Sequence, residues 1–109
     1  MPELSTDALR SLDSADAIAD DSVVAYYLAD RKRRISVARV DGRLYAFDDS
    51  CTHLQCPLSG GLLTGTTIMC QCHGSRFDIT TGAVMNGPAT EPLQTYEVSE
   101  VDGAIQLRG

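Results

Sequence analysis

Every cysteine and histidine of this chain lies in one short segment, and this clustering limits its fold and function more than any other feature. The four cysteines and two histidines all fall between Cys51 and His73 of a 109-residue chain. They stand as Cys51-Thr52-His53, then sixteen residues that include Cys56, then Cys70-Gln71-Cys72-His73. The surrounding stretch is rich in glycine, which suits tight turns and close backbone approaches. The sequence therefore predicts a loop-rich metal-binding region over about residues 50–92.

The flanking sequence predicts a β scaffold. Short runs of β-branched and aromatic residues, which favour strands, alternate with glycine-containing turns. Asp41-Gly42 and Asp102-Gly103 are strong two-residue hairpin signals. No long segment has a helical period, so an all-β antiparallel sandwich or small barrel is expected. The expected strands cover residues 23–28, 35–40, 43–47, 66–69, 96–101 and 104–107.

The length predicts one domain over residues 1–109, with the metal-binding region inserted into the β base. Residues 1–21 form an N-terminal segment rich in Asp, Ser and Ala, for which we expect a frayed end or a packed loop. A short helical turn over residues 7–12 is the alternative. The segment lacks the basic and apolar regions of a signal peptide, so we expect a cytoplasmic protein.

Composition excludes several function classes. Nine Lys and Arg against fifteen Asp and Glu give a net charge of −6, which argues against a nucleic-acid partner. No apolar run is long enough to span a bilayer, so we expect no membrane partner. The basic run Arg31-Lys32-Arg33-Arg34 is expected to be a solvated turn remote from the metal region. The acidic remainder is expected to steer association with a basic partner surface.

The spacing of the cysteines and histidines favours two neighbouring metal atoms over a single ion. Cys51 and His53 diverge too much to close comfortably on one metal, whereas two such loops give one metal both Cys and the other both His. This is the ligation of a Rieske [2Fe–2S] centre. A Cys2His2 zinc site fits the order and gaps poorly. A disulfide scaffold, or satisfied core histidines, leaves the paired pattern unexplained.

Three stretches carry a resemblance to the Rieske family: CTHLQCPLSGG from residue 51, CQCHGSRFDITTG from residue 70, and Gly87-Pro88-Ala89. In pattern, the resemblance extends over about residues 22–107. It implies that Cys51 and Cys70 bind an inner iron. It also implies that His53 and His73 bind an outer, solvent-facing iron, and that the Pro88 loop covers one [2Fe–2S] cluster per chain.

The resemblance also implies roles for residues that are not ligands. In the high-potential members of the family, cysteines matching Cys56 and Cys72 form a disulfide between the two cluster loops. Ser75 matches a serine that donates a hydrogen bond to a bridging sulfide. Phe77 stands where those members have a tyrosine bonded to a cluster cysteine, a bond that Phe cannot donate. Two reduced thiols and an ordinary turn serine are the alternatives.

The function implied is one-electron transfer without catalysis. The cysteines and histidines are all used, so none remain for a 2-His-1-carboxylate oxygenase iron. The chain resembles a soluble Rieske ferredoxin, a monomer that passes electrons from a flavin reductase to a terminal oxygenase. One alternative is a small Rieske subunit of a larger oxidoreductase, of the arsenite oxidase or nitrite reductase type. Another is a zinc-stabilised interaction module.

Overall fold

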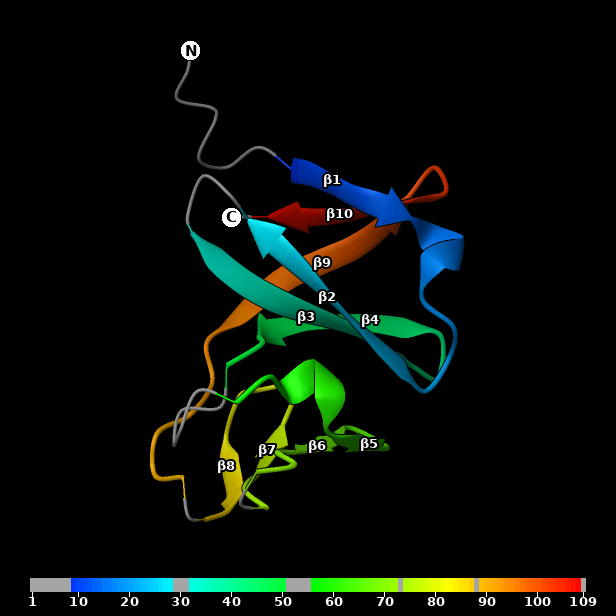
Figure 1. Ribbon diagram of the computed structural model, residues 1–109. Helices are drawn as coiled ribbons and strands as arrows, with labels where there is room; N and C mark the ends of the chain where they lie inside the picture. The colour runs from blue at the N-terminus through cyan, green and yellow to red at the C-terminus, as the bar shows by residue number, and fades with distance from the viewer. Residues whose placement is uncertain (1–8, 29–31, 51–55, 73, 88, 109) are drawn as a thin grey trace.

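The computed structural model describes residues 9–28, 32–50, 56–72, 74–87 and 89–108. Apart from two short 3-10 turns, its regular secondary structure consists of strands, in one sheet of six and one of four (Figure 1). The six-stranded sheet has the order β1-β10-β9-β4-β3-β2, and the four-stranded sheet has the order β5-β6-β7-β8. This confirms the all-β antiparallel class expected from the sequence.

The large sheet contains β1 Leu9–Ser14, β2 Ser22–Leu28, β3 Arg33–Val40, β4 Arg43–Asp48, β9 Thr95–Val101 and β10 Ala104–Arg108. The small sheet contains β5 Leu62–Thr64, β6 Thr67–Met69, β7 Arg76–Asp78 and β8 Val84–Asn86. Two short 3-10 turns, η1 Ala15–Ala17 and η2 Leu58–Gly60, complete the described elements. Neither of these is long or apolar enough to cross a membrane, and the described residues hold no other helix.

Both predicted Asp-Gly turns close hairpins of the large sheet. Asp41 and Gly42 have φ angles of 52° and 80° between β3 and β4, and Asp102 and Gly103 have 51° and 78° between β9 and β10. Positive φ at both central positions is the geometry of the hairpin turn that follows the right-handed twist of the strands. Both hairpins expected from the sequence are therefore present.

The N-terminal segment corrects one expectation. Residues 9–14 form β1, which pairs with β10, instead of a frayed end, a loop or a helical turn. The run holds no β-branched residue, so local propensity gave no strand signal. Pairing with β10 satisfies the backbone groups of that strand, and half-buried Leu12 packs against the core.

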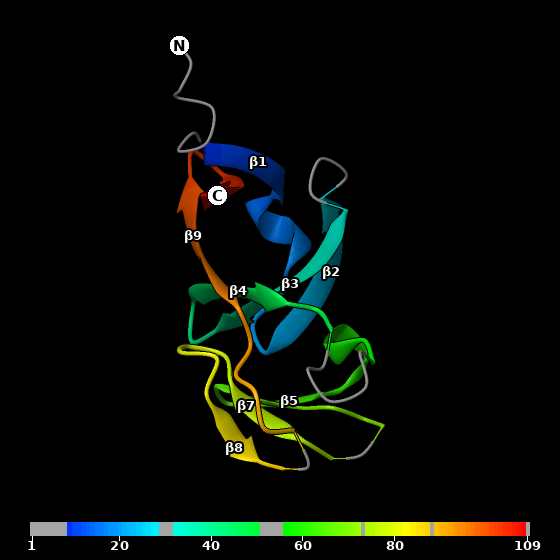
Figure 2. The same ribbon diagram turned by 90° about the vertical axis from the view of Figure 1, so that its left-hand side faces the viewer.

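Strand β3 is buried on both faces and separates two cores. Alternate side chains of a strand point to opposite faces, so Ile35 and Val37 enter one core while Ala38 and Val40 enter the other. The first core lies inside the curl of the large sheet, with β2 and β3 opposite β9 (Figure 2). The second joins the large sheet to the small one. It contains Ala38, Val40, Phe47, Leu58, Ile68, Cys70, Phe77, Ile79, Ala89 and Leu93.

Candidate functional site

The described residues on either side of the first predicted ligand segment are held together in a short neck. Ser50 and Pro57 form an isolated antiparallel bridge directly after β4. The backbone N–H of Leu58 donates to the carbonyl of Asp49, which fixes the start of η2 against the end of the strand. The predicted ligands Cys51 and His53 lie in the interval that this neck closes, and outside the described residues.

The buried carboxylate of Asp49 holds this neck to the large sheet through hydrogen bonds. Asp49 has no exposed surface, and its Oδ1 accepts from the hydroxyl of Ser36 and the backbone N–H of Ser59, both at 2.7 Å. Its Oδ2 accepts from Nε of Arg34 at 2.6 Å. One side chain thus links β3, the end of β4 and η2. The sequence reasoning missed Asp49, because an acidic residue after a strand looks like any loop residue.

The basic run is a correction too. Arg33 and Arg34 lie in β3, whereas Lys32 lies in an exposed turn, as expected. Arg34 pairs with Asp49, and Nη1 of Arg33 donates to the hydroxyl of Tyr96 at 2.8 Å. Arg31 lies outside the described residues. These two arginines of the run therefore make side-chain hydrogen bonds that tie β3 to β9 and to the end of β4.

The second predicted ligand segment is the turn between β6 and β7. The N–H of Cys70 donates to the carbonyl of Ser75 at 2.7 Å, and the N–H of Gly74 donates to the carbonyl of Cys70 at 3.0 Å. Gly74 has a φ of 81°, a conformation that side chains rarely tolerate. These bonds hold Cys70, Gly74 and Ser75 close together, whereas the predicted ligand His73 lies outside the described residues.

A disulfide joins the two loops. Cys56, which precedes the neck residue Pro57, is bonded to Cys72, with their Cα atoms 6.5 Å apart. The structure therefore contains the cross-link that the family resemblance implies. Because Cys72 directly precedes His73, the bond also brings the end of the first ligand segment to the second.

Cys70 places one thiol where a metal ligand is needed. It is 1% exposed, and its Sγ lies within 4.8 Å of the sulfur atoms of Cys56 and Cys72. The disulfide consumes those two sulfurs, so Cys70 is the described cysteine that is able to bind metal as a thiolate. A buried sulfur at the mouth of two cross-linked loops fits the inner-iron position of a [2Fe–2S] cluster.

Ser75 fits a role beside such a cluster. It is fully buried, and its hydroxyl oxygen accepts from the backbone N–H of Ala89 at 3.0 Å. The hydroxyl proton therefore points elsewhere and is available to an acceptor such as a sulfide. The same bond holds the chain just after Pro88, which itself lies outside the described residues.

Phe77 lies on the inner face of β7 and is fully buried in the core that also contains Cys70 and Ile68. Its ring has no group that donates a hydrogen bond. At this position the structure supplies packing alone.

Comparison with known proteins agrees with the site described above. The family described as the Rieske [2Fe-2S] domain matches residues 10–97 of the chain. Ferredoxin CarAc of Metapseudomonas resinovorans is 39% identical over 75 residues, which cover 69% of this chain and 70% of that protein.

Solved structures agree over nearly the whole chain. The ferredoxin of Sphingomonas yanoikuyae B1 superposes with a TM-score of 0.87 and 33% identity, covering 94% of this chain and 99% of that one. A chain in the complex of reduced oxygenase and oxidized ferredoxin in carbazole 1,9a-dioxygenase gives a TM-score of 0.87 and 30% identity. There the match covers 93% of each chain.

Proposed function

This chain belongs to the Rieske [2Fe–2S] family, and from that premise we propose that it carries single electrons from a flavin reductase to a terminal oxygenase. The relatives named above are ferredoxins, which are electron carriers and not catalysts. This favours the carrier over a subunit of a larger oxidoreductase of the arsenite oxidase or nitrite reductase type. We further propose that the chain is one domain, works as a monomer and is cytoplasmic.

The observation that supports this function is the buried Cys70 sulfur beside the disulfide that joins the two loops. We assign Cys51 and Cys70 to an inner iron, and His53 and His73 to an outer one. A bound [2Fe–2S] cluster supplies reversible uptake of one electron, at potentials of about −150 to +300 mV for two-His ligation. The chain's own residues exclude water around Cys70, orient the Ser75 hydroxyl and keep the loops from separating.

Metal and sulfide analysis tests the proposal. We expect two irons and two acid-labile sulfides per chain, and reduction of the purified protein by one electron. Cys70→Ala and His73→Ala should each abolish cluster assembly, because a metal site requires its full set of ligands. Cys72→Ser removes a neighbouring sulfur but keeps all four proposed ligands, so it should still assemble the cluster, although loss of the disulfide should make that cluster release iron faster. One zinc per chain without sulfide would establish the interaction module instead.

A further inference from the structure

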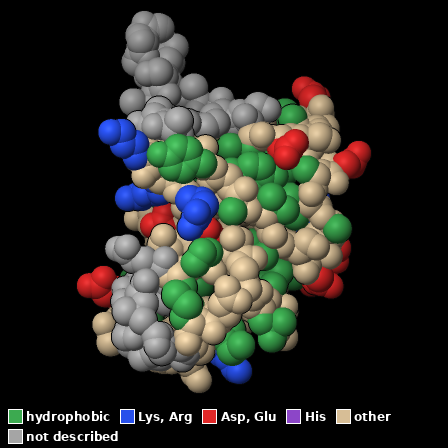
Figure 3. Space-filling view, in the orientation of Figure 1, with side chains coloured by type: hydrophobic (Ala, Val, Ile, Leu, Met, Phe, Trp, Pro, Cys, Tyr) green, Lys and Arg blue, Asp and Glu red, His purple; other side chains and the backbone are tan. Residues whose placement is uncertain are grey.

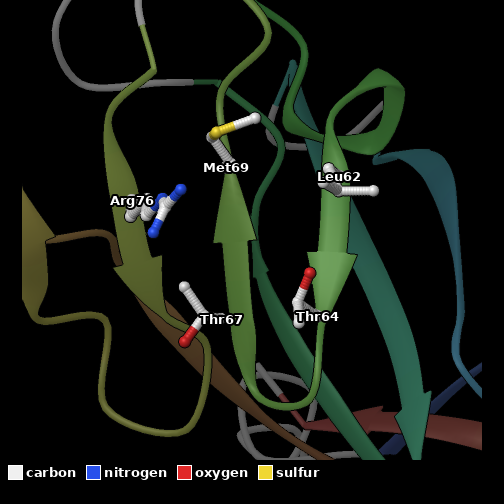
Figure 4. Close-up of a pocket in the computed structure, with 5 residues that line it drawn as sticks. All are labelled: Leu62, Thr64, Thr67, Met69 and Arg76. Atoms are coloured by element: carbon white, nitrogen blue, oxygen red, sulfur yellow. The ribbon is translucent and has the colours of Figure 1, made fainter.

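The outer face of the small sheet carries a row of side chains that crosses all four strands. Leu62 pairs with Met69, Met69 with Arg76, and Arg76 with Asn86. Directly paired residues of an antiparallel sheet point to the same face, so Leu62, Met69 and Arg76 are neighbours there. Asn86 follows beyond Arg76, across an irregularity in the β7–β8 register. Figure 4 shows Leu62, Met69 and Arg76 side by side on β5, β6 and β7. We call these four residues the transverse row.

The transverse row lies at the end of the sheet from which the second cluster loop emerges. Met69 directly precedes Cys70, and Arg76 directly follows Ser75. Adjacent strands are about 4.8 Å apart, so four strands span about 14 Å. A standard protein interface covers roughly 800 Å² on each partner, or about 28 Å across. A partner that covers this loop therefore covers the row as well.

The row combines exposed apolar surface with one cation. Leu62 is 58% exposed, although it is a large hydrophobic side chain. A groove of about 250 Å³ runs along this face, lined by Leu62, Thr64, Thr67, Met69 and Arg76. Arg76 is exposed, and no carboxylate among the described residues lies within salt-bridge distance of it. Arginine beside apolar surface is a composition typical of interface hot spots.

The region around the row is almost without charge. Residues 50–92 contain only Arg76, Asp78 and Glu91 as charged residues, out of 24 in the whole chain. Asp78 is half-buried and accepts from Thr80. In Figure 3 the small-sheet end shows mainly hydrophobic and uncharged side chains on the visible face. Arg76 is therefore the one Lys or Arg of residues 50–92.

We propose that the transverse row is a docking surface for the terminal oxygenase, which presents a carboxylate to Arg76 among apolar side chains around Leu62 and Met69. This inference rests on the proposed electron-carrier function. Arginine suits the role because its planar guanidinium binds a carboxylate through two hydrogen bonds, which strengthen when the apolar rim excludes water. A ferredoxin 30% identical to this chain has been solved in complex with its oxygenase, which favours that partner as the occupant.

The test measures two electron transfers with the cluster-loaded protein. Both partners are purified from the host organism. The oxygenase is followed through purification by its ability to oxidise the reduced chain, and the flavin reductase by its ability to reduce the oxidised chain. The variants are Arg76→Glu and Leu62→Ser. Arg43→Glu and Val101→Ser are matched controls, because they change an exposed arginine and an exposed hydrophobic residue of the large sheet. The visible spectrum and potential of each variant establish that its cluster is intact.

We expect Arg76→Glu to slow transfer to the oxygenase at least tenfold, and Leu62→Ser to slow it about threefold, with both controls close to wild type. Retained rates in both row variants would overturn the docking surface but leave the carrier function standing. Loss confined to the reductase reaction would overturn it too, since the occupant would then be the reductase. If no oxygenase takes electrons from the wild-type chain, both the carrier function and the docking surface fail.

Discussion

The backbone N–H of Ser59 donates to the buried carboxylate of Asp49 at 2.7 Å, so the large sheet fixes the first turn after the first ligand segment. The same oxygen accepts from Ser36, and the other accepts from Arg34. A carboxylate with no exposed surface is stable only when its oxygens are occupied in this way. Asp49 therefore links the neck formed by Ser50 and Pro57 to β3 through hydrogen bonds.

Asp49→Asn should destabilise the protein and loosen the first ligand segment. The amide cannot accept on both sides, so its NH2 group faces a donor on Arg34 or Ser59. Hydrogen bonds to charged groups contribute about 1.5–3 kcal/mol each, so we expect the free energy of unfolding to fall by about 2 kcal/mol. Urea denaturation measures this, and the rate of iron loss to a chelator should rise in parallel.

Asp48→Asn is the matched control for that change. Asp48 is only half-buried. Its Oδ1 accepts from the hydroxyl of Tyr96 and lies 3.8 Å from Nη1 of Arg33. A partly exposed pair contributes less than about 1 kcal/mol. Equal losses of stability in the two variants would show that the buried hydrogen bonds of Asp49 contribute no more than those of a partly exposed carboxylate.

Ser75→Ala should lower the reduction potential. Hydrogen bonds to cluster sulfur stabilise the extra electron, and the substitution removes the buried hydroxyl proton that the bond from Ala89 leaves available. It also leaves the N–H of Ala89 without an acceptor, at a cost of about 1–3 kcal/mol. Voltammetry and urea denaturation measure the two effects. An unchanged potential in a destabilised variant would restrict Ser75 to a structural role.

Phe77→Tyr should raise the potential, provided that the new hydroxyl reaches the sulfur of a ligand cysteine. Phe77 and Cys70 belong to the same buried core, which makes that approach feasible. A buried hydroxyl without a partner costs about 1–3 kcal/mol, so a formed bond also preserves stability. A lower unfolding free energy with no change in potential would contradict the prediction.

The disulfide should be detectable in the purified protein. Intact mass under denaturing, non-reducing conditions should be lower than that of the fully reduced chain by two hydrogen atoms. Cys56 and Cys72 are 16 residues apart, and closing a loop of about 15 residues stabilises a protein by about 3 kcal/mol. The Cys56→Ser variant should lose most of this stabilisation and release iron faster than the wild-type chain. Complete alkylation of both thiols without prior reduction would disprove the bond.

Stability at alkaline pH should depend on Tyr26. Burial, followed by the charge of Asp13 and its hydrogen bond, raises the pKa of Tyr26 to about 12. The folded protein holds this proton more tightly than the unfolded chain, whose tyrosines have a pKa near 10.0. The resulting stabilisation is complete below pH 10 and lost as the pH rises to about 12. Tyr26→Phe should therefore flatten the fall in unfolding free energy over that range, and an unchanged fall would contradict the prediction.

The sequence predicted the parts of the fold that local chemistry determines. Asp41-Gly42 and Asp102-Gly103 determine their turns through positive φ, and β3 is read from its β-branched residues. Strand β1 was missed because only its pairing with β10 makes it a strand. The three-residue strands β5, β7 and β8 were missed because they are too short for a periodic signal. Strand β6 is equally short, but its β-branched residues indicated it.

The candidate site shows the same division. Cys70 was identified because its spacing from the other cysteines and histidines carries chemical meaning. The link from Asp49 to Ser36 and Ser59 was not predictable, since it depends on how β3 and η2 meet in space. The transverse row likewise requires the register of four strands, which the residues alone do not specify.

The core between the two sheets has a consequence for protein engineering. Ala38, Val40 and Phe47 of the large sheet pack in the same cluster as Ile68 and Phe77 of the small one. The small sheet and its loops therefore have no interior of their own to transplant. A graft of this redox centre onto another scaffold has to bring β3 and β4 with it, or recreate their inner surface in the new host.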